Sequence, residues 1–139
     1  MRGTMSNIVV FDSSVLIDQI RTNCYLDRML NLTGVVRNSA VVLAELWRGA
    51  TTQVDRQVVQ EIEERHPILT PTEKNWLESG RILAKIFTDK GHEPQKLRDL
   101  HFDVLIALTA RFHGARLITS NRADFELIRE YREFDLELW

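Results

Sequence analysis

An α/β fold with a mainly parallel central sheet is the architecture that this sequence predicts. Short runs rich in β-branched residues alternate with longer stretches whose apolar residues recur at helical spacing, which is typical of parallel strands joined by helices. The 139 residues suit one compact domain, and the 44% of apolar and 27% of charged residues are ordinary values for a globular protein. We therefore expect a single domain over residues 1–139, with residues 1–6 flexible.

The amino-terminal part of the chain predicts a strand followed by helices. Residues 7–11 form a short apolar, β-branched run, and Asp12 comes directly after it, at the carboxyl end of the strand. Ser13 or Ser14 is expected to cap the next helix, because a serine hydroxyl accepts hydrogen bonds from the free N–H groups of a first turn. A further helical pattern covers residues 25–32.

The next part of the chain predicts a strand and two helices. Residues 35–38 form a second short strand, and Ser39 is placed to cap a helix that ends at Gly49. Glu45 lies in the middle of this apolar helix. Residues 52–65 mix apolar and charged side chains at helical spacing, which indicates another helix.

Extended chain is expected at residues 67–70, followed by a long helix from Pro71 towards Asp89. Residues 97–113 predict a helix that is apolar on more than one side and therefore largely buried. Asp103 interrupts its apolar surface.

The last strands are expected near the carboxyl terminus. Residues 115–119 form an apolar run, followed by the polar turn at 120–122 and then Asp124. Residues 134–139 alternate apolar and acidic side chains, which predicts an edge strand.

Charge and cysteine content limit the classes of protein that fit. There are 18 Lys and Arg against 20 Asp and Glu, so the strongly basic character of many nucleic-acid binders is absent. That objection weakens if the acids hold divalent ions, because each ion brings two positive charges to the place of a phosphate. Cys24 is the only cysteine, and no run is long and apolar enough for a signal peptide or membrane span. We expect a cytoplasmic protein.

Four acidic residues are the candidates for chemistry. Asp12 and Asp124 follow two predicted strands, and the carboxyl ends of parallel strands share one edge of a sheet, where such folds bind ligands. Glu45 and Asp103 would join them from helices. The structural alternative for Asp12 and Asp124 is that each only caps a helix.

Glu45 and Asp103 are harder to explain structurally, because each lies in apolar helical sequence and an unpaired buried carboxylate is costly. Each of these acids needs a partner. A salt bridge to Arg48 or Arg111 is the structural alternative to a role in a functional site.

Four stretches of the chain resemble, in order, the motifs of PIN-domain nucleases. They are residues 10–17, 44–50, 103–110 and 117–125, and the likeness spans nearly the whole chain. One such motif is weak evidence, whereas four in the right order are fairly specific for the family. The compact length and the Glu45-Leu-x-x-Gly-Ala pattern look most like the VapC-type toxins of bacterial and archaeal toxin–antitoxin pairs.

The resemblance implies a three-layer α/β/α sandwich and an endonuclease that cleaves RNA, leaving a 5′ phosphate and a 3′ hydroxyl. It also implies a homodimer and an antitoxin that covers the acidic cleft and an apolar groove. The catalytic and metal-binding quartet that it implies is Asp12, Glu45, Asp103 and Asp124. The hydroxyl and amide groups that would support the quartet belong to Ser13 or Ser14, Thr119, Ser120 and Asn121.

Mg²⁺ or Mn²⁺ is the expected cofactor. These ions prefer oxygen ligands and retain waters, so a few carboxylates hold the ion and leave room for water and phosphate. A metal-held water attacks phosphorus more readily at neutral pH, and the ion offsets the charge that builds up on the phosphate. Without metal the four carboxylates repel one another, and at least one should take up a proton.

Basic residues near the motifs are secondary candidates for binding substrate. Arg48 and Arg122 are expected to contact phosphate, the alternative being local salt bridges. Lys96 and Arg98 precede the helix of Asp103 and are candidates for lining an RNA path, or else exposed loop charges. The four histidines lack the paired spacing of a zinc site, and His101 is expected at the surface.

Two other functions compete with the toxin ribonuclease. One is a PIN-type nuclease of RNA processing or DNA repair, because metal-assisted hydrolysis does not use the 2′-hydroxyl and the motifs do not separate RNA from DNA. The other is a catalytically degenerate module that binds an ion for signalling or structure. Cleavage assays separate these from one another.

Overall fold

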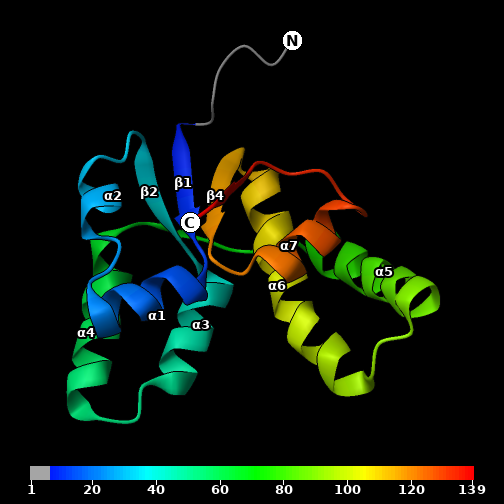
Figure 1. Ribbon diagram of the computed structural model, residues 1–139, viewed down its shortest axis with the longest axis horizontal. Helices are drawn as coiled ribbons and strands as arrows, with labels where there is room; N and C mark the ends of the chain where they lie inside the picture. The colour runs from blue at the N-terminus through cyan, green and yellow to red at the C-terminus, as the bar shows by residue number, and fades with distance from the viewer. Residues whose placement is uncertain (1–6) are drawn as a thin grey trace.

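The computed structural model describes residues 7–139, and within them five parallel strands form one sheet in the order β3-β2-β1-β4-β5 (Figure 1). The strands are β1 (Ile8–Phe11), β2 (Val35–Ser39), β3 (Ile68–Leu69), β4 (Ala115–Thr119) and β5 (Leu136–Leu138). All four pairings are parallel, which confirms the predicted sheet. The expectation that residues 1–6 are flexible lies outside the described residues.

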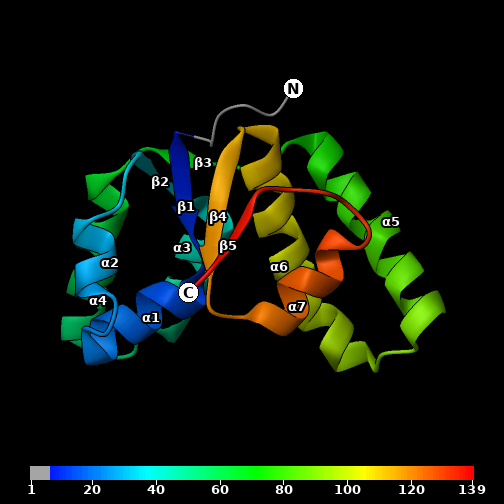
Figure 2. The ribbon, with the colours of Figure 1, turned by 45° about the horizontal axis from the view of Figure 1, so that its top comes forward.

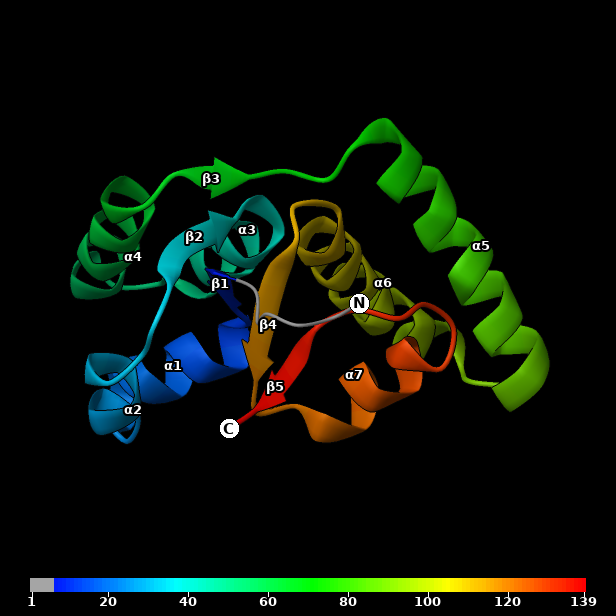
Figure 3. The same cartoon turned by 90° about the horizontal axis from the view of Figure 1, so that it is seen from above.

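Helices connect the strands and cover both faces of the sheet, so the predicted three-layer α/β/α architecture is confirmed (Figure 3). The helices are α1 (Ser13–Thr22), α2 (Leu26–Leu30), α3 (Ala40–Gly49), α4 (Gln53–Arg65), α5 (Glu73–Lys90), α6 (Pro94–Phe112) and α7 (Arg122–Arg129). None of the helices described in residues 7–139 is both long and apolar enough to span a bilayer.

Strand β1 lies at the centre of the sheet, and its side chains alternate between two apolar cores. Val9 and Phe11 pack with Ile118 on the face covered by α1 and α2. Val10 belongs to the larger core on the opposite face, which α3 and α6 supply with most of their buried residues. The two-residue period of a strand therefore explains why this run is apolar throughout.

The carboxyl ends of the strands meet at one edge of the sheet. Figure 1 shows α1, α3 and the segment before α7 leaving the sheet at this edge, below β1, β2 and β4. Val10 of β1 is in register with Arg37 of β2 and Leu117 of β4. Residues that follow these three strands are therefore brought together, although they are far apart in the sequence.

The last strand lies beside β4 at the outer edge of the sheet, on the side away from β3 (Figure 2). Glu137 is in register with Ile118, so the expected edge strand near the carboxyl terminus is confirmed. Trp139, just after it, packs its ring 5.5 Å from that of Phe11, centroid to centroid. The carboxyl terminus thus closes one of the two cores.

Helix caps agree with the sequence in part. The Ser39 side chain accepts a hydrogen bond from the backbone N–H of Val42, so the predicted cap of α3 is confirmed. The prediction that Ser13 or Ser14 caps α1 is wrong: Asp12 holds the cap position, and both serines lie in the first turn with their hydroxyls bonded to acids. Asp12 makes no side-chain cap hydrogen bond, so capping does not account for its carboxylate.

Two helix starts differ from prediction. Helix α5 begins at Glu73 behind the capping side chain of Thr72 instead of at Pro71. Helix α6 begins at Pro94, three residues before the predicted start, because proline suits the first turn of a helix. The longer α6 adds nearly one turn at the end closest to the site described below.

Candidate active site

The site begins where β1 and β4 end side by side. The backbone N–H of Asp12 donates to the carbonyl of Ile118 at 2.9 Å, which continues the ladder between the two strands. Asp12 and Thr119 are consequently neighbours at the carboxyl edge of the sheet. Both are almost fully buried, with 2% and 0% of their surface exposed.

Asp12 has one saturated and one open carboxylate oxygen. Its Oδ2 accepts hydrogen bonds from the hydroxyls of Ser14 and Thr119, each at 2.8 Å. Its Oδ1 is buried and has no hydrogen-bond partner in the described part of the chain. Because an unsatisfied buried carboxylate oxygen is costly, the open Oδ1 points to a ligand that completes the site.

Glu45 reaches the same site from the middle of α3. Its Oε1 accepts a hydrogen bond from the Ser13 hydroxyl at 3.2 Å. Burial and the nearby charge of Asp12 raise the pKa of Glu45, although the Ser13 hydrogen bond and Arg48 oppose that rise. Ser13 therefore holds the carboxyl group of Glu45 in place, while burial and the charge of Asp12 disfavour its ionised form.

Asp103 on α6 is the most perturbed acid of the group. Burial, together with the charges of Asp12, Glu45 and Asp124, raises its pKa to about 8, and Lys96 offsets only part of that effect. In the absence of a bound cation Asp103 therefore carries a proton at neutral pH. This agrees with the expectation that one acid of the quartet protonates when no metal is present.

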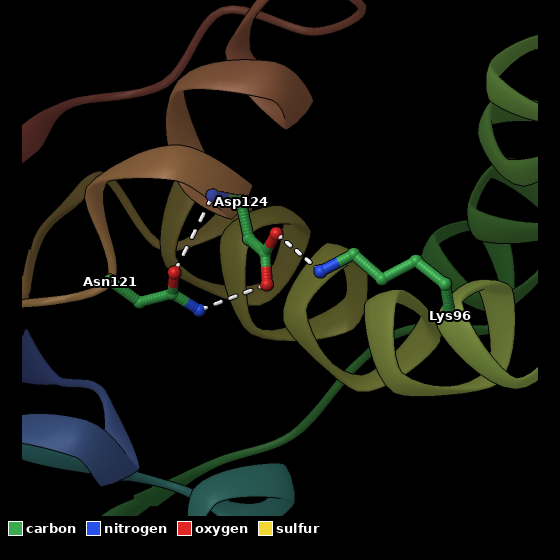
Figure 4. A network of polar contacts seen from close by, with 3 residues as sticks. All are labelled: Lys96, Asn121 and Asp124. Atoms are coloured by element: carbon green, nitrogen blue, oxygen red, sulfur yellow. Dashed lines mark hydrogen bonds and ion pairs between the residues drawn. The ribbon is translucent and has the colours of Figure 1, made fainter. Parts of the chain in front are cut away.

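Asp124, in the first turn of α7, is held by two partners (Figure 4). Its Oδ2 accepts a hydrogen bond from the Asn121 side chain at 3.1 Å, and its backbone N–H donates to the same side chain at 3.4 Å. Its Oδ1 forms an ion pair with Lys96 Nζ at 2.7 Å. Asn121, not Asp124, is the cap of α7, so capping does not explain this acid either.

These groups surround one open cleft of about 710 Å³. Most of the predicted site residues line it: Asp12, Ser13, Ser14, Glu45, Arg48, Asp103, Asn121 and Asp124. Thr119 and Ser120 do not line the cleft but contact residues that do: the Thr119 hydroxyl donates to Asp12, and the backbone N–H of Ser120 donates to the Ser14 hydroxyl at 3.3 Å. Arg122 does not line the cleft and pairs with Glu126 at 2.9 Å.

The amino-terminal turns of α6 contribute cleft residues that were not among the predicted site residues. Gln95, His101 and Phe102 line it together with the candidate Arg98. His101 is half-buried: it reaches the surface at the cleft, as predicted, and its Nε2 lies 3.0 Å from the Ser79 hydroxyl of α5. Gln95 was missed because the predicted helix began at residue 97, whereas His101 and Phe102 lay within that helix and had no separate signal in the sequence.

The alternative explanation of the buried acids as salt-bridge partners fails. Among residues 7–139 no ion pair joins Glu45 or Asp103 to a basic side chain. Arg111 instead donates to the backbone carbonyl of Glu133, and the guanidinium of Arg48 lies 5.5 Å from the ring centre of Phe102. The two acids therefore line the cleft without an ion-pair partner from the described part of the chain.

The donor set fits a hard divalent cation. All candidate ligands are carboxylate oxygens, and Asp12 Oδ1 is buried and open. Within residues 7–139 no three acidic, histidine or cysteine side chains are already gathered around one ion position. Mg²⁺ tolerates this, because it keeps several waters and usually takes only one or two carboxylates. Asp12, Glu45, Asp103 and Asp124 are the residues that would hold it.

Comparison with known proteins identifies the family. The model of the PIN domain matches residues 9–131, which is most of the chain. The chain belongs to the PIN domain family. No curated protein sequence matches this PIN domain.

Solved structures confirm the fold over nearly the whole length. VapBC-1 from nontypeable Haemophilus influenzae matches with a TM-score of 0.71 and 24% identity, covering 95% of this chain and 98% of that one. DNA-bound VapBC from Salmonella typhimurium matches with a TM-score of 0.71 and 23% identity, covering 98% and 99%. VapBC-5 from Mycobacterium tuberculosis, a member of the VapBC family of toxin–antitoxin systems, matches with a TM-score of 0.64 and 22% identity. The match covers 96% of this chain and 99% of that one. The PIN domain described here has the fold of these chains.

Proposed function

We propose that this PIN domain is a Mg²⁺- or Mn²⁺-dependent endoribonuclease, acting in the cytoplasm as the VapC-like toxin of a type II toxin–antitoxin pair. The observation that carries the proposal is that one cleft is lined by four acids, Asp12, Glu45, Asp103 and Asp124. In addition, Oδ1 of Asp12 is buried without a hydrogen-bond partner in the described part of the chain. Membership of the PIN family and the fold shared with VapBC chains support it.

A bound divalent ion supplies an activated water and the positive charge that phosphodiester hydrolysis needs. The residues of the chain hold and orient the site. Ser14 and Thr119 restrain Asp12 through Oδ2 and leave Oδ1 without a partner, and Glu45 is restrained by Ser13. Asp103 holds a proton while no cation is present and releases it when a cation binds, because a metal ligand has to be deprotonated.

Basic residues at the rim of the cleft are proposed to bind the substrate phosphates. Arg48, which lies against the ring of Phe102, and Arg98 both line the cleft. Together they would guide a phosphodiester towards the acids, which an acidic cleft on a chain of net charge -2 would otherwise repel. The position of Arg122, away from the cleft lining and paired with Glu126, gives it little part in this proposal.

An apolar groove beside the cleft is proposed to receive the antitoxin. It lies between α1, α3 and α4 and is lined by Ile20, Val58 and Val59. Ile17 and Glu45 line both this groove and the acidic cleft, so the two are continuous. A partner segment that places apolar side chains in the groove and a basic one at the acids would block the site. A homodimer is proposed from the same family likeness.

Cleavage of a mixed pool of structured RNA by the purified protein is the test. Wild-type protein is incubated with Mg²⁺, with Mn²⁺ or with a chelator, beside the variants Asp103→Asn and Glu61→Gln. Glu61 is an exposed acid on α4, so its variant controls for the loss of one negative charge. We expect metal-dependent cuts with 5′ phosphate ends for wild type and Glu61→Gln, and none for Asp103→Asn.

Other outcomes favour the competing functions. Cuts in DNA or flap substrates but not in RNA would move the proposal to a PIN nuclease of repair. Binding of Mn²⁺ by well-folded protein without cleavage of any nucleic acid would favour the degenerate metal-binding module. Equal cleavage by Asp103→Asn and wild type would overturn the assignment of the acidic quartet.

A further inference from the structure

Asp124 differs from the other three acids because the chain already supplies it with a cation. Lys96 Nζ lies 2.7 Å from Asp124 Oδ1, and Asn121 Nδ2 donates to Oδ2 at 3.1 Å. Both carboxylate oxygens of Asp124 are therefore occupied (Figure 4). Each oxygen still has a free lone pair, but a divalent ion that bound directly to Asp124 would lie close to the Lys96 ammonium group and be repelled by it.

Asp12 shows the opposite arrangement. Its Oδ2 is saturated by hydroxyl donors, whereas its Oδ1 is buried without a partner. Within residues 7–139 neither Glu45 nor Asp103 forms an ion pair with a basic side chain, in contrast to Asp124. Among the four acids of the cleft, Asp124 is therefore the one that the described part of the chain pairs with an ammonium group.

The ammonium group is held there by the fold. Helix α6 starts at Pro94, so Lys96 lies in its first turn and extends towards the first turn of α7, 28 residues further along the chain. The side chain of Lys96 is 41% exposed and that of Asp124 is 19% exposed, so the pair lies at the mouth of the site. A lysine ammonium is a compact charge with three donors, which lets it replace an ion beside a carboxylate.

We propose that Lys96 is an internal cation that takes the place of a second divalent ion on the Asp124 side of the cleft. The site then binds one divalent ion, held by Asp12, Asp103 and Glu45. This inference rests on the proposed metal-dependent function and deepens it, because it states how many ions the site takes and which residue sets that number.

The test is a count of bound Mn²⁺ by electron paramagnetic resonance and calorimetry, with Mn²⁺ as the only added ligand. Three variants are compared with wild type: Lys96→Met, Lys96→Arg and Lys85→Met. Lys85 is an exposed lysine of α5, so its variant makes the same change of charge elsewhere. Circular dichroism confirms that each variant is folded.

We expect one Mn²⁺ per chain for wild type, Lys96→Arg and Lys85→Met, and two for Lys96→Met. Any weak binding of a second ion to wild type should be at least about tenfold weaker than the binding of the second ion to Lys96→Met. Two ions in wild type, or one ion with unchanged affinity in Lys96→Met, would overturn the role of Lys96. Either of these results would be compatible with the proposed metal-dependent cleavage. Wild-type protein that binds no Mn²⁺ would overturn the proposed function and this inference together.

Discussion

Replacing Asp103 with asparagine is expected to stabilise the metal-free protein at neutral and higher pH. The pKa of this carboxyl group is about 8 in the folded protein, against 3.8 for the ordinary group. Burial among three other acids makes its ionised form unfavourable, whereas the unfolded chain ionises it freely. Asparagine has nearly the same shape and is never charged, so it removes this penalty.

The sign and size of the effect follow from the two pKa values. The contribution of Asp103 to stability is fully present below about pH 4, falls as the pH rises and is lost above about pH 8. At about 1.4 kcal/mol for each pKa unit, the whole effect is about 6 kcal/mol, and the part between about pH 5 and pH 8.5 is at most about 4 kcal/mol. The free energy of unfolding of wild type should therefore fall over this range by that much more than that of Asp103→Asn.

Urea unfolding of both proteins at a series of pH values, with chelator present, measures the difference directly. Glu61→Gln serves as the control and should follow the wild-type pH dependence, because Glu61 is exposed on α4. Saturating Mg²⁺ should restore much of the lost stability to wild type and less to Asp103→Asn, since a ligand stabilises the state that binds it. Parallel curves for wild type and Asp103→Asn between about pH 5 and pH 8.5 would refute the argument.

Substitutions at three positions test the site and the fold around it. Thr119→Val removes the buried hydroxyl that donates to Asp12 at 2.8 Å, so it should cost about 1–3 kcal/mol of stability and weaken Mn²⁺ binding. Thr119→Ser keeps the hydroxyl and should retain most of the stability and of the Mn²⁺ affinity. Equal Mn²⁺ affinity in Thr119→Val and wild type would count against the restraint of Asp12 by Thr119. Gly34→Ala should destabilise the protein by more than about 1 kcal/mol in thermal unfolding. The reason is that Gly34 has a φ of +125° and that a Cβ there would lie 2.7 Å from the carbonyl oxygen of Asn7. An unchanged melting temperature would contradict this. Gly80→Ala, in the open middle of α5, should instead add about 0.5–1 kcal/mol, and a loss of stability there would be the contrary result.

The strand ends of the site were predictable because their signals are local. A β-branched run ends at Asp12, and the apolar run 115–119 is followed by polar residues up to Asp124, so a parallel sheet brings both acids to one edge. Glu45 and Asp103 were recognisable because carboxylates are unusual in apolar helices. Their positions needed only the alternation of strands and helices and the order of the motifs.

The ion pair of Lys96 with Asp124 was not predictable in the same way. It joins residues 28 positions apart and depends on the turn that α6 gains by starting at Pro94 instead of residue 97. The contact of His101 with Ser79 was not predictable for a related reason, because it comes from the packing of α5 on α6. Contacts between separate helices leave no periodic signal in either sequence segment.

The hydrogen bond between Thr119 and Asp12 spans 107 residues of a 139-residue chain, and this has a consequence for how the protein is made. Contacts of such long separation form late, since the chain must first lose the entropy of closing a long loop. During synthesis, the carboxylate cluster has no oriented Asp12 until the β4 segment has been made and has paired with β1. Any activity of the cleft is therefore withheld from the nascent chain until most of it has been synthesised and folded.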